Sequence, residues 1–530
     1  MIRINNIRLP LDYTDSTIRR KISKQLRIDE NAIKSCNIFR RSVDARKKDN
    51  ICFLTSVDAE LNINEDKILK KCNGTQAVAP YHYNVPKWKG GAKPVIVGSG
   101  PAGLFSALIL AQSGAKPILI ERGKDVDRRT NDVNAFWATG RLNTKSNVQF
   151  GEGGAGTFSD GKLNSGTKDA RQRKVLEEFV SHGAPEEILY NAKPHIGTDK
   201  LKITVKNIRE DIIRLGGTVM FETQLIDFKT KDENIISAVV SKEGKTEFID
   251  TDSIILAIGH SARDTFEMLY DKKIPIEAKS FSVGTRIEHL REQIDRSQYG
   301  KFAGNKRLGA ANYKMNVHLE NGRGVYTFCM CPGGKVVNAS SEDGRLVTNG
   351  MSEFARDEVN SNSALLVGVS PNDFAGEHPL KCMHFQRELE EKAFILGGEN
   401  YTAPVQRVAD FLEGHKSKHL GEVIPSIGPN YLLTDISAIF PDYITMSLKQ
   451  GIINMGKKLK EFDNGDAVLT AVESRSSSPI RILRNNETLE SVGVKGLYPC
   501  GEGAGYAGGI ISAAVDGIKC AEKLIEKSQL

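Results

Sequence analysis

The chain lacks the marks of an exported or membrane-spanning protein. No signal peptide is visible, because Arg3 and Arg8 interrupt any apolar run at the start. The most apolar window, residues 94–120, contains several glycines, a proline and Lys116, so we expect no transmembrane helix. The eight cysteines form no C-x-x-C pair, which argues against a disulfide framework and against a zinc site. We therefore expect reduced thiols and a cytoplasmic protein.

The composition is that of a globular protein, with 26% charged and 39% hydrophobic residues. A length of 530 residues suggests about three to four domains of average size. Residues 1–90 hold 18 Lys and Arg against 10 Asp and Glu, whereas the remaining 440 hold 55 against 56. The net charge of +7 therefore comes from the N-terminal part.

Residues 1–88 read as a separate basic module. Strand and helix patterns follow one another in β-α-β-β-α-β order, which predicts a ferredoxin-like α+β fold. Its cationic spots are Arg19 to Lys21 and the hairpin tip Arg46 to Lys48. They form either a solvated basic surface or a docking site for an acidic redox partner or RNA. No aromatic-rich RNA signature supports the last of these.

Residues 93–123 show a strand, a glycine turn, a helix and a second strand. Gly98, Gly100 and Gly103 form G-x-G-x-x-G: the first permits a sharp exit from the strand, the second a close approach to a pyrophosphate, and the third tight helix–sheet packing. Glu121 ends the second strand, where a carboxylate accepts ribose hydroxyls and favours FAD or NAD over NADP. The alternative is a chance glycine turn. The predicted cofactor contacts here are Gly98, Ser99, Gly100, Pro101, Ala102, Gly103, Glu121 and Arg122.

The same glycine spacing recurs twice. In residues 147–163 no helix or acid follows it, so this loop is either a flexible loop or a backbone surface against the first cofactor. In residues 496–527 it stands between a strand and the last helix, where it looks like the closing FAD motif of flavoproteins. There Glu502 would bond ribityl or phosphate-linked oxygens, and the helix N-terminus would face the flavin. The further predicted contacts are Gly153, Gly154, Gly156, Thr157, Leu225, Gly259, His260, Gly501, Glu502, Gly508, Gly509 and Ile510.

Between these motifs the pattern changes. Asp199 is a predicted cap for a helix over residues 200–215, and residues 218–228 read as one strand. From residue 281 short strands precede longer helices. We therefore expect an α/β chain: a Rossmann-type FAD-binding domain in two parts, 93–280 and 467–530, an inserted α+β substrate domain, 281–466, and the N-terminal module, 1–88.

Taken together, the motifs resemble a family of uncharacterised bacterial FAD-dependent dehydrogenases with a two-domain core of the glutathione-reductase type. The resemblance covers nearly the whole chain. It implies a bound FAD and an oxidoreductase role, and it gives no substrate. It rests on FRRSVDARKK (39–48), VIVGSGPAGL (95–104), FGEGGAGTFSDGKL (150–163), KPHIGTDKL (193–201), FSVGTRIEH (281–289), YTFCMCPGGKVV (326–337), TNGMS (348–352), ESRSSSPIRI (473–482) and LYPCGEGAGYAGGI (497–510).

Six side chains are candidates for catalysis. Cys329 and Cys331 are either a redox dithiol, which would close a small strained ring, or a strand-packed pair that lines the substrate side. His195 is a candidate proton donor beside the flavin or a hydrogen-bonded histidine before a helix. A guanidinium of Arg286, Arg475 or Arg481 would hold a substrate carboxylate. The alternatives are an interdomain salt bridge for Arg286 and a surface turn for Arg475 and Arg481.

The sequence thus predicts an FAD-dependent oxidoreductase that transfers a hydride through a non-covalent flavin. Only one complete Rossmann unit is present, so NAD(P)H would dock transiently, or electrons would come from a small-molecule substrate or an acidic carrier protein. The other hypotheses are an RNA-associated flavoprotein and a non-catalytic FAD-binding partner.

Overall fold

Five short parallel strands form a sheet that joins the beginning and the end of residues 93–529, here called the main body. In the computed structural model, which describes residues 1–166 and 168–529, they lie in the order β23-β11-β5-β6-β7. Leu530, the last residue of the predicted segment 467–530, lies outside the described residues. The strands are β5 Val95–Val97, β6 Ile118–Ile120, β7 Thr218–Met220, β11 Ile254–Leu256 and β23 Leu497–Pro499.

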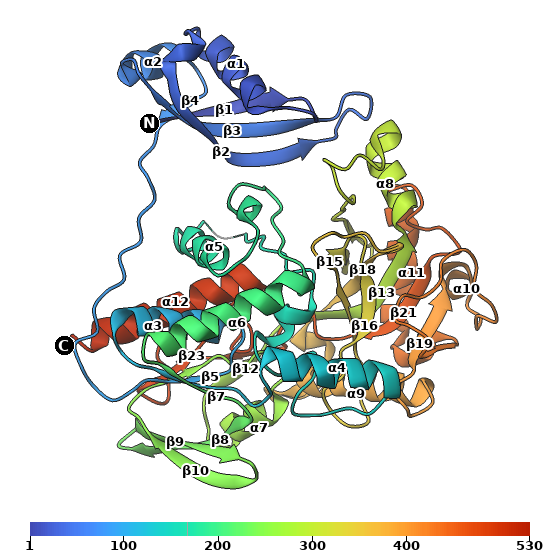
Figure 1. Cartoon of the computed structure of the whole chain (residues 1–530). Helices are drawn as coiled ribbons and strands as arrows, with labels where there is room; N and C mark the ends of the chain where they lie inside the picture. The colour runs from blue at the N-terminus through green and yellow to red at the C-terminus, as the bar shows by residue number, and fades with distance from the viewer. Residues whose placement is uncertain (167, 530) are drawn as a thin grey trace.

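Alternate side chains of this sheet pack on two different layers, because successive residues of a strand point to opposite faces. Ile96 of β5 and Ile255 of β11 belong to the core shared with the helices. Val95 and Leu256 belong to the core shared with an antiparallel three-stranded sheet. Figure 1 shows helices on one side and this small sheet on the other. The helices are α3 Pro101–Ser113, α6 Thr198–Arg214 and α12 Ile510–Lys527; the strands are β8 Thr223–Lys231, β9 Asn234–Lys242 and β10 Lys245–Asp250.

A second, seven-stranded sheet has the order β14-β15-β18-β13-β21-β19-β20. Its strand β21 pairs with β13, so the sheet crosses the predicted boundary between residues 466 and 467. Two short pairs, β12 with β22 and β16 with β17, flank it. The strands are β13 Phe281–Leu290, β14 Asn316–His318, β15 Gly324–Cys331, β18 Asn360–Val369, β19 Ala403–Arg407, β20 Tyr431–Leu433, β21 Val468–Glu473, β12 Ile276–Ala278, β22 Ile480–Ile482, β16 Lys335–Asn338 and β17 Thr348–Met351.

The remaining helices cover these sheets and connect them. These helices are α4 Val126–Thr139, α5 Arg171–Ser181, α7 Arg263–Asp271, α8 Arg291–Tyr299, α9 Lys381–Leu396, α10 Val408–Glu413 and α11 Asp442–Gly456. In the part of the chain that the structure describes, no helix combines the length and apolarity that crossing a membrane would require.

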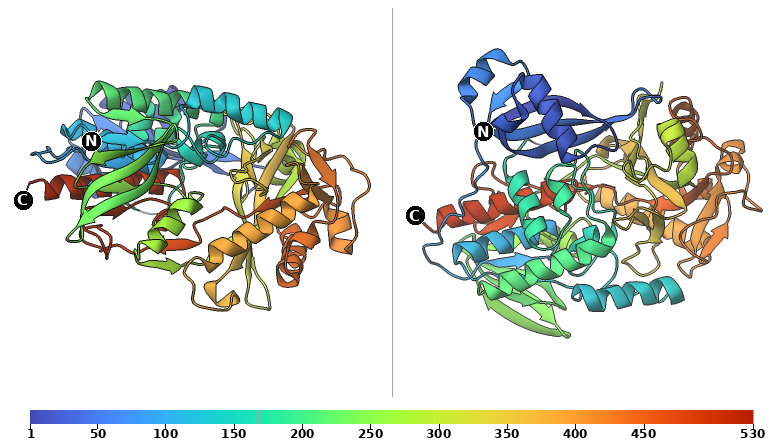
Figure 2. Two further views of the ribbon diagram at one scale, coloured as in Figure 1. Left: turned by 90° about the horizontal axis from the view of Figure 1, so that it is seen from below. Right: turned by 45° about the horizontal axis from the view of Figure 1, so that its top comes forward.

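The N-terminal residues form their own four-stranded antiparallel sheet in the order β2-β3-β1-β4. The elements follow the predicted β-α-β-β-α-β order: β1 Ile2–Leu9, α1 Asp15–Leu26, β2 Ile33–Asp44, β3 Cys52–Leu61, α2 Glu65–Lys71 and β4 Thr75–Ala77. The β2–β3 turn reaches α8 (Figure 2), where Lys48 donates to the Ser297 carbonyl at 2.7 Å. The Arg41 N–H donates to the Tyr190 carbonyl at 2.7 Å. Arg307 also donates to the Tyr13 carbonyl at 3.4 Å, so the module contacts the main body at three places at least.

Two local predictions are wrong. The segment 218–228 is two strands, because Glu222 adopts a left-handed φ of 53° and its N–H donates to the Gly123 carbonyl. Helix α6 begins at Thr198 after Gly197, and the Asp199 carboxylate accepts from the Phe354 N–H at 2.8 Å instead of capping the helix.

Candidate functional site

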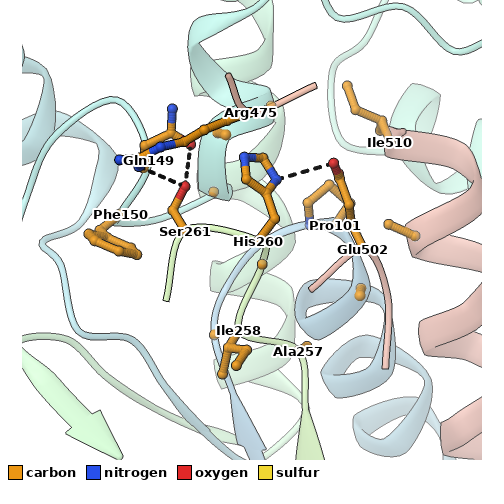
Figure 3. Close-up of a pocket in the computed structure, with 18 of the residues that line it drawn as sticks. Pro101, Gln149, Phe150, Ala257, Ile258, His260, Ser261, Arg475, Glu502 and Ile510 are labelled. Atoms are coloured by element: carbon orange, nitrogen blue, oxygen red, sulfur yellow. Dashed lines mark hydrogen bonds and ion pairs between the residues drawn. The ribbon is translucent and has the colours of Figure 1, made fainter. Parts of the chain in front are cut away.

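A single cavity lies where the carboxyl ends of the five parallel strands face the seven-stranded sheet. It contains about 1370 Å³ of empty space, counting the open water at its mouth. Residues from both ends of the main body line it, some of them shown in Figure 3. The predicted cofactor residues in its wall are Gly98, Gly100, Pro101, Ala102, Glu121, Arg122, Gly154, Gly156, Leu225, Gly259, His260, Glu502, Gly508, Gly509 and Ile510.

Five predicted cofactor residues do not line the cavity. A Cβ on Gly103 would lie 1.8 Å from the Gly98 carbonyl oxygen, so this glycine serves the packing of α3 on β5, as expected. A Cβ on Gly501 would lie 2.8 Å from the Ala102 Cβ. The remaining three, Ser99, Gly153 and Thr157, take part in the hydrogen bonds described below. We therefore correct their role from cofactor contact to support of the turns.

The Glu121 carboxylate is already fully engaged within the chain. It accepts from the Ser99 N–H and hydroxyl at 2.9 and 2.8 Å, and from the N–H groups of Gly123 and Gly151 at 2.9 and 3.0 Å. A carboxylate has about four lone-pair positions. A ribose hydroxyl would have to replace one of these donors, and the rotatable Ser99 hydroxyl is the one that can turn away. Glu121 therefore organises both glycine turns as well as facing the cavity.

The second glycine loop is held by a buried guanidinium. Arg129 of α4 is fully buried and donates to the carbonyls of Asn147, Val148, Gly151 and Glu152. Burial lowers the pKa of Arg129 to about 10, still far above neutrality.

This loop lies directly against the first glycine turn. The Gly153 N–H donates to the Ser99 carbonyl at 2.9 Å, and a Cβ on Gly154 would be 3.0 Å from the Gly100 Cα. The Thr157 hydroxyl donates back to the Glu152 carbonyl at 3.1 Å. Gly154 and Gly156 are thereby placed in the cavity wall as a backbone surface.

Comparisons with known proteins agree with this geometry. Residues 280–476 match a family model described as "FAD-dependent protein, C-terminal domain-like", residues 92–131 match an FAD binding domain, and residues 1–60 match a domain of unknown function. An uncharacterized protein of Clostridium beijerinckii is 51% identical over 100% of this chain and 99% of its own length. The chain belongs to the family of FAD-dependent flavoproteins. FAD is its cofactor.

The flavoprotein is also similar to several solved structures, at a much lower sequence identity than to the Clostridium beijerinckii protein. The flavin-dependent brominase Bmp2 is 12% identical, with a TM-score of 0.38 over 83% of this chain and 79% of its own. A flavoprotein/dehydrogenase from Cytophaga hutchinsonii is also 12% identical, with a TM-score of 0.36 over the same shares. A geranylgeranyl bacteriochlorophyll reductase-like protein from Thermoplasma acidophilum is 12% identical, with a TM-score of 0.36 over 82% and 79%.

The residues of the cavity fit FAD. At Gly259, Gly508 and Gly509 a Cβ would meet nothing within 4 Å, so the backbone there leaves room for a ligand to approach closely. Gly100 and Gly509, in the same wall, are the N-cap residues of helices α3 and α12. The first-turn N–H groups of a helix are suited to phosphate and flavin oxygens. FAD supplies the two-electron chemistry, and the chain's residues orient it.

His260, after β11, forms a pair with Glu502 of the closing motif. The Nδ1 atom of His260 lies 3.2 Å from a Glu502 oxygen (Figure 3). Its Nε2 atom is buried and has no hydrogen-bond partner among the described residues. Next to it, the Ser261 hydroxyl donates to Gln149 and accepts from Arg475, both at 3.1 Å (Figure 3). His260 therefore ties the β11 turn to the closing motif.

The structure overturns the proposed role of Arg475 as a substrate clamp. Its guanidinium makes two bonds to Glu390, at 3.0 and 2.7 Å, and donates to the hydroxyls of Ser261 and Ser341. Glu390 is fully buried between Arg475 and Arg263, and these two guanidinium groups hold the pKa of its carboxyl far below the usual range. Arg475 thus lines the cavity with its hydrogen-bonding groups engaged.

Arg286 and Arg481 also differ from expectation, since neither lines the cavity. Arg286 is fully buried, and its Nη1 lies 3.4 Å from Glu473 of the neighbouring strand. The salt bridge is thus within one sheet. Arg481 is 40% exposed, and its guanidinium lies 3.6 Å from Glu277 on the paired strand β12.

His195 lies outside the cavity wall as well. Its ring stacks on Phe354 with centroids 5.2 Å apart, and its Nε2 donates to the Phe354 carbonyl at 3.0 Å. Burial lowers its pKa to about 4. The alternative of a hydrogen-bonded histidine before a helix describes it better than a donor beside the flavin.

The two cysteines of β15 have different surroundings. A bulge between Phe328 and Cys331 gives Cys329 a left-handed φ of 42° and places it, exposed, in the cavity wall. Cys331 is buried, and its thiol donates to the Cys329 carbonyl at 3.3 Å. The surrounding protein raises the pKa of the Cys329 thiol to about 11. Cys329 is therefore a neutral thiol that faces the ligand space.

Sequence reasoning missed the cavity residues contributed by the seven-stranded sheet and its neighbours. Glu473 had a usable signal, because a carboxylate there ends the otherwise apolar strand VLTAVE and opens the ESRSSSPIRI segment. Four others lie in motifs that carry the family resemblance but were not singled out: Phe150, Phe328, Asn349 and Ser476. Gln149 and Ser261 carry no local signal.

Three potential metal ligands, Cys500, Asp516 and Cys520, meet behind the closing motif within 4.8 Å of one another. The Asp516 carboxylate already accepts two bonds from Arg484 and one from the Gly501 N–H. A guanidinium thus neutralises this carboxylate. The pKa of the Cys500 thiol is raised by its hydrogen bond to Cys520 and by burial.

Proposed function

We propose that this flavoprotein is an oxidoreductase that passes a hydride between non-covalently held FAD and a small organic molecule. One observation carries the proposal: the cavity lined by the first glycine turn and by the closing motif is also lined by residues of the seven-stranded sheet and of the neighbouring strand β17. There Phe328, Cys329, Asn349 and Glu473 line it. The glycine turns supply the surface for the dinucleotide, so the substrate would bind at the end formed by β15, β17 and β21.

The proposed organisation is of the glutathione-reductase type. The five-stranded sheet, closed by β23, would form the FAD-binding part, and the seven-stranded sheet would form the inserted substrate part. The N-terminal sheet would be a ferredoxin-like module. The sequence contains one complete Rossmann unit, which starts at β5 and would bind FAD. No second unit is left for a stable NAD(P)H site, so NAD(P)H would reach the flavin by transient docking.

The experiment is reduction of the purified, FAD-loaded protein in a stopped-flow spectrometer. NADH, NADPH and a panel of small metabolites serve as donors, and bleaching of the flavin absorbance is followed. We expect at least one donor to reduce the flavin at a rate that saturates with its concentration. A flavin that no donor reduces would favour the non-catalytic FAD-binding partner, and a protein that stays colourless in excess FAD would overturn the proposal.

An acidic carrier protein is the partner that the charge of the N-terminal module favours, since residues 1–90 carry 18 basic against 10 acidic groups. Arg46 is 80% exposed and pairs with Asp44 inside the module, while Arg20 and Lys21 stand exposed on α1. Association with an acidic carrier should weaken with added salt and when Arg20 and Lys21 are replaced by Glu. Tight, salt-sensitive RNA binding by the whole chain would favour the RNA-associated alternative.

A further inference from the structure

Glu473 is the cavity carboxylate with the least compensation. It ends β21, is 4% exposed and lines the cavity. Its Oε1 lies 3.4 Å from Nη1 of Arg286. Its Oε2 is buried and has no hydrogen-bond partner among the described residues. A buried carboxylate oxygen without a donor is costly when charged, so a proton is easily held there.

Neighbouring groups fix the position of Arg286 and hold it at this distance from Glu473. Its guanidinium donates to the Asn362 side chain at 3.1 and 2.5 Å and to the Cys329 carbonyl at 3.0 Å. A Cβ on Gly350 would lie 2.2 Å from its Nη2. Arg286 therefore cannot swing to form a two-pronged pair with Glu473.

The other charged and titratable groups around Glu473 leave its charge incompletely balanced. His260, after β11, and Arg286, on β13, favour the carboxylate, whereas burial disfavours it and raises its pKa. Cys329 on β15 is a neutral thiol at ordinary pH. Glu390 on α9 is neutralised by Arg263 and Arg475.

The two other carboxylates of the cavity wall are better compensated. Glu121 accepts four hydrogen bonds. Glu502 pairs with the imidazole of His260. Of the three carboxylates, Glu473 is the one with a buried oxygen that lacks a hydrogen-bond donor among the described residues, so a new negative charge in the cavity would favour a proton there.

We propose that Glu473 takes up one proton from water when FAD bound in the cavity is reduced by two electrons, and releases it on reoxidation. The inference rests on the proposed function. Two electrons from the donor would enter the flavin, and the added negative charge would lie in the cavity that the Glu473 carboxylate lines. One proton converts the Glu473 carboxylate to the carboxylic acid, in addition to the protons that the flavin itself binds.

The test compares the FAD-loaded wild type with Glu473→Gln and with the control Glu288→Gln. Glu288 is also a buried carboxylate of the seven-stranded sheet, but it is hydrogen-bonded to Ser426 and Asn360 and does not line the cavity. The midpoint potential of the flavin is measured by dithionite titration from pH 5 to 9. One extra proton changes the equilibrium constant tenfold per pH unit, which is about 30 mV for two electrons.

We expect wild type and Glu288→Gln to share a pH range in which the potential falls about 30 mV per pH unit more steeply than in Glu473→Gln. Equal slopes in all three proteins would overturn the inference and leave the proposed function intact. A wild type that binds no FAD would overturn both.

Should Glu473→Gln fail to hold FAD, infrared spectra of the wild type and of Glu473→Asp decide. The infrared difference between its reduced and oxidised forms should show a new carboxylic-acid carbonyl band that shifts in heavy water. Glu473→Asp, which keeps a carboxyl group, should move this band without removing it. A spectrum without such a band would contradict proton uptake by Glu473.

Discussion

At the scale of single residues, the glycines of the cavity differ in what a side chain would meet. On Gly103 a Cβ would collide with the Gly98 carbonyl oxygen at 1.8 Å, whether or not a ligand is present. On Gly508 a Cβ would meet nothing within 4 Å and would point into space next to the cavity. One glycine therefore serves the fold of the chain, and the other serves the approach of FAD.

Alanine at these two positions should separate the two roles. Gly103→Ala should lower the free energy of unfolding of the FAD-free protein by about 1–3 kcal/mol, as overpacked sites do. Gly508→Ala should leave this free energy unchanged and weaken FAD binding about tenfold or more, a loss of about 1.4 kcal/mol. Urea unfolding and FAD titration measure the two quantities. Gly324→Ala, at a glycine where a Cβ also meets nothing within 4 Å but which does not line the cavity, is the control and should change neither.

Buried histidines make the folded state sensitive to acid. His195 has a pKa of about 4 in the folded protein because burial disfavours the imidazolium, against an ordinary value of 6.5. Above pH 6.5 the ring is neutral in both states. As the pH falls from 6.5 towards 4, the unfolded chain binds the proton first, so stability is lost in this window.

We therefore expect the free energy of unfolding to fall less between pH 7 and pH 4.5 in His195→Gln than in the wild type. The difference should be about 2–3 kcal/mol, since each pKa unit corresponds to about 1.4 kcal/mol. Urea unfolding at several pH values gives this quantity. His318→Gln, at an exposed histidine of β14, should retain the wild-type loss. If the free energy of unfolding fell equally with pH in His195→Gln and in the wild type, the low pKa of His195 in the folded protein would be refuted.

At the scale of helices, strands and loops, local patterns predicted most of what is observed. The β-α-β-β-α-β order of residues 1–88 and the strand, turn, helix and strand of residues 93–123 are observed as predicted, because these signals lie within one segment. Arg475 shows where such reasoning stops. Its partner Glu390 lies 85 positions away on another element, and no spacing in the sequence indicates that pair. The same holds for Arg129 and the four carbonyls it serves.

The second glycine loop depends on one guanidinium of α4. Arg129→Lys keeps the charge but offers a single nitrogen to four carbonyl groups. Each buried carbonyl left without a donor costs about 1–3 kcal/mol. We expect the loop to loosen and FAD affinity to fall at least tenfold in fluorescence titrations. The adjacent Arg128→Lys, at a residue whose side chain is 51% exposed, should bind FAD as the wild type does.

At the scale of the whole molecule, segments far apart in the chain complete one another. Strand β23 pairs with β11 only after some 240 intervening residues have built the seven-stranded sheet. The cavity is therefore incomplete until the last part of the chain is in place. The N-terminal module is arranged differently, since its own sheet is complete. It meets the main body through polar contacts and through apolar packing that joins the two parts in one hydrophobic cluster.

Arg41 is the main side chain of that contact. It donates to Asn191 at 3.1 Å, and its guanidinium lies between the rings of Phe53 and Tyr190, at 5.2 and 5.1 Å from their centroids. Removal of one hydrogen bond and one cation–π contact across the interface costs about 1–2 kcal/mol. Such a loss changes the ratio of docked to undocked module by a factor of about 5–30.

Arg41→Ala should therefore enlarge the radius of gyration in small-angle X-ray scattering and speed proteolysis within residues 81–91, the segment that joins the module to the main body. Arg40→Ala removes the neighbouring exposed arginine and should leave both measurements as in the wild type. FAD binding should be the same in all three proteins, because neither arginine lines the cavity. If Arg41→Ala weakened FAD binding while the scattering profile stayed constant, the module would instead be a part of the cofactor site.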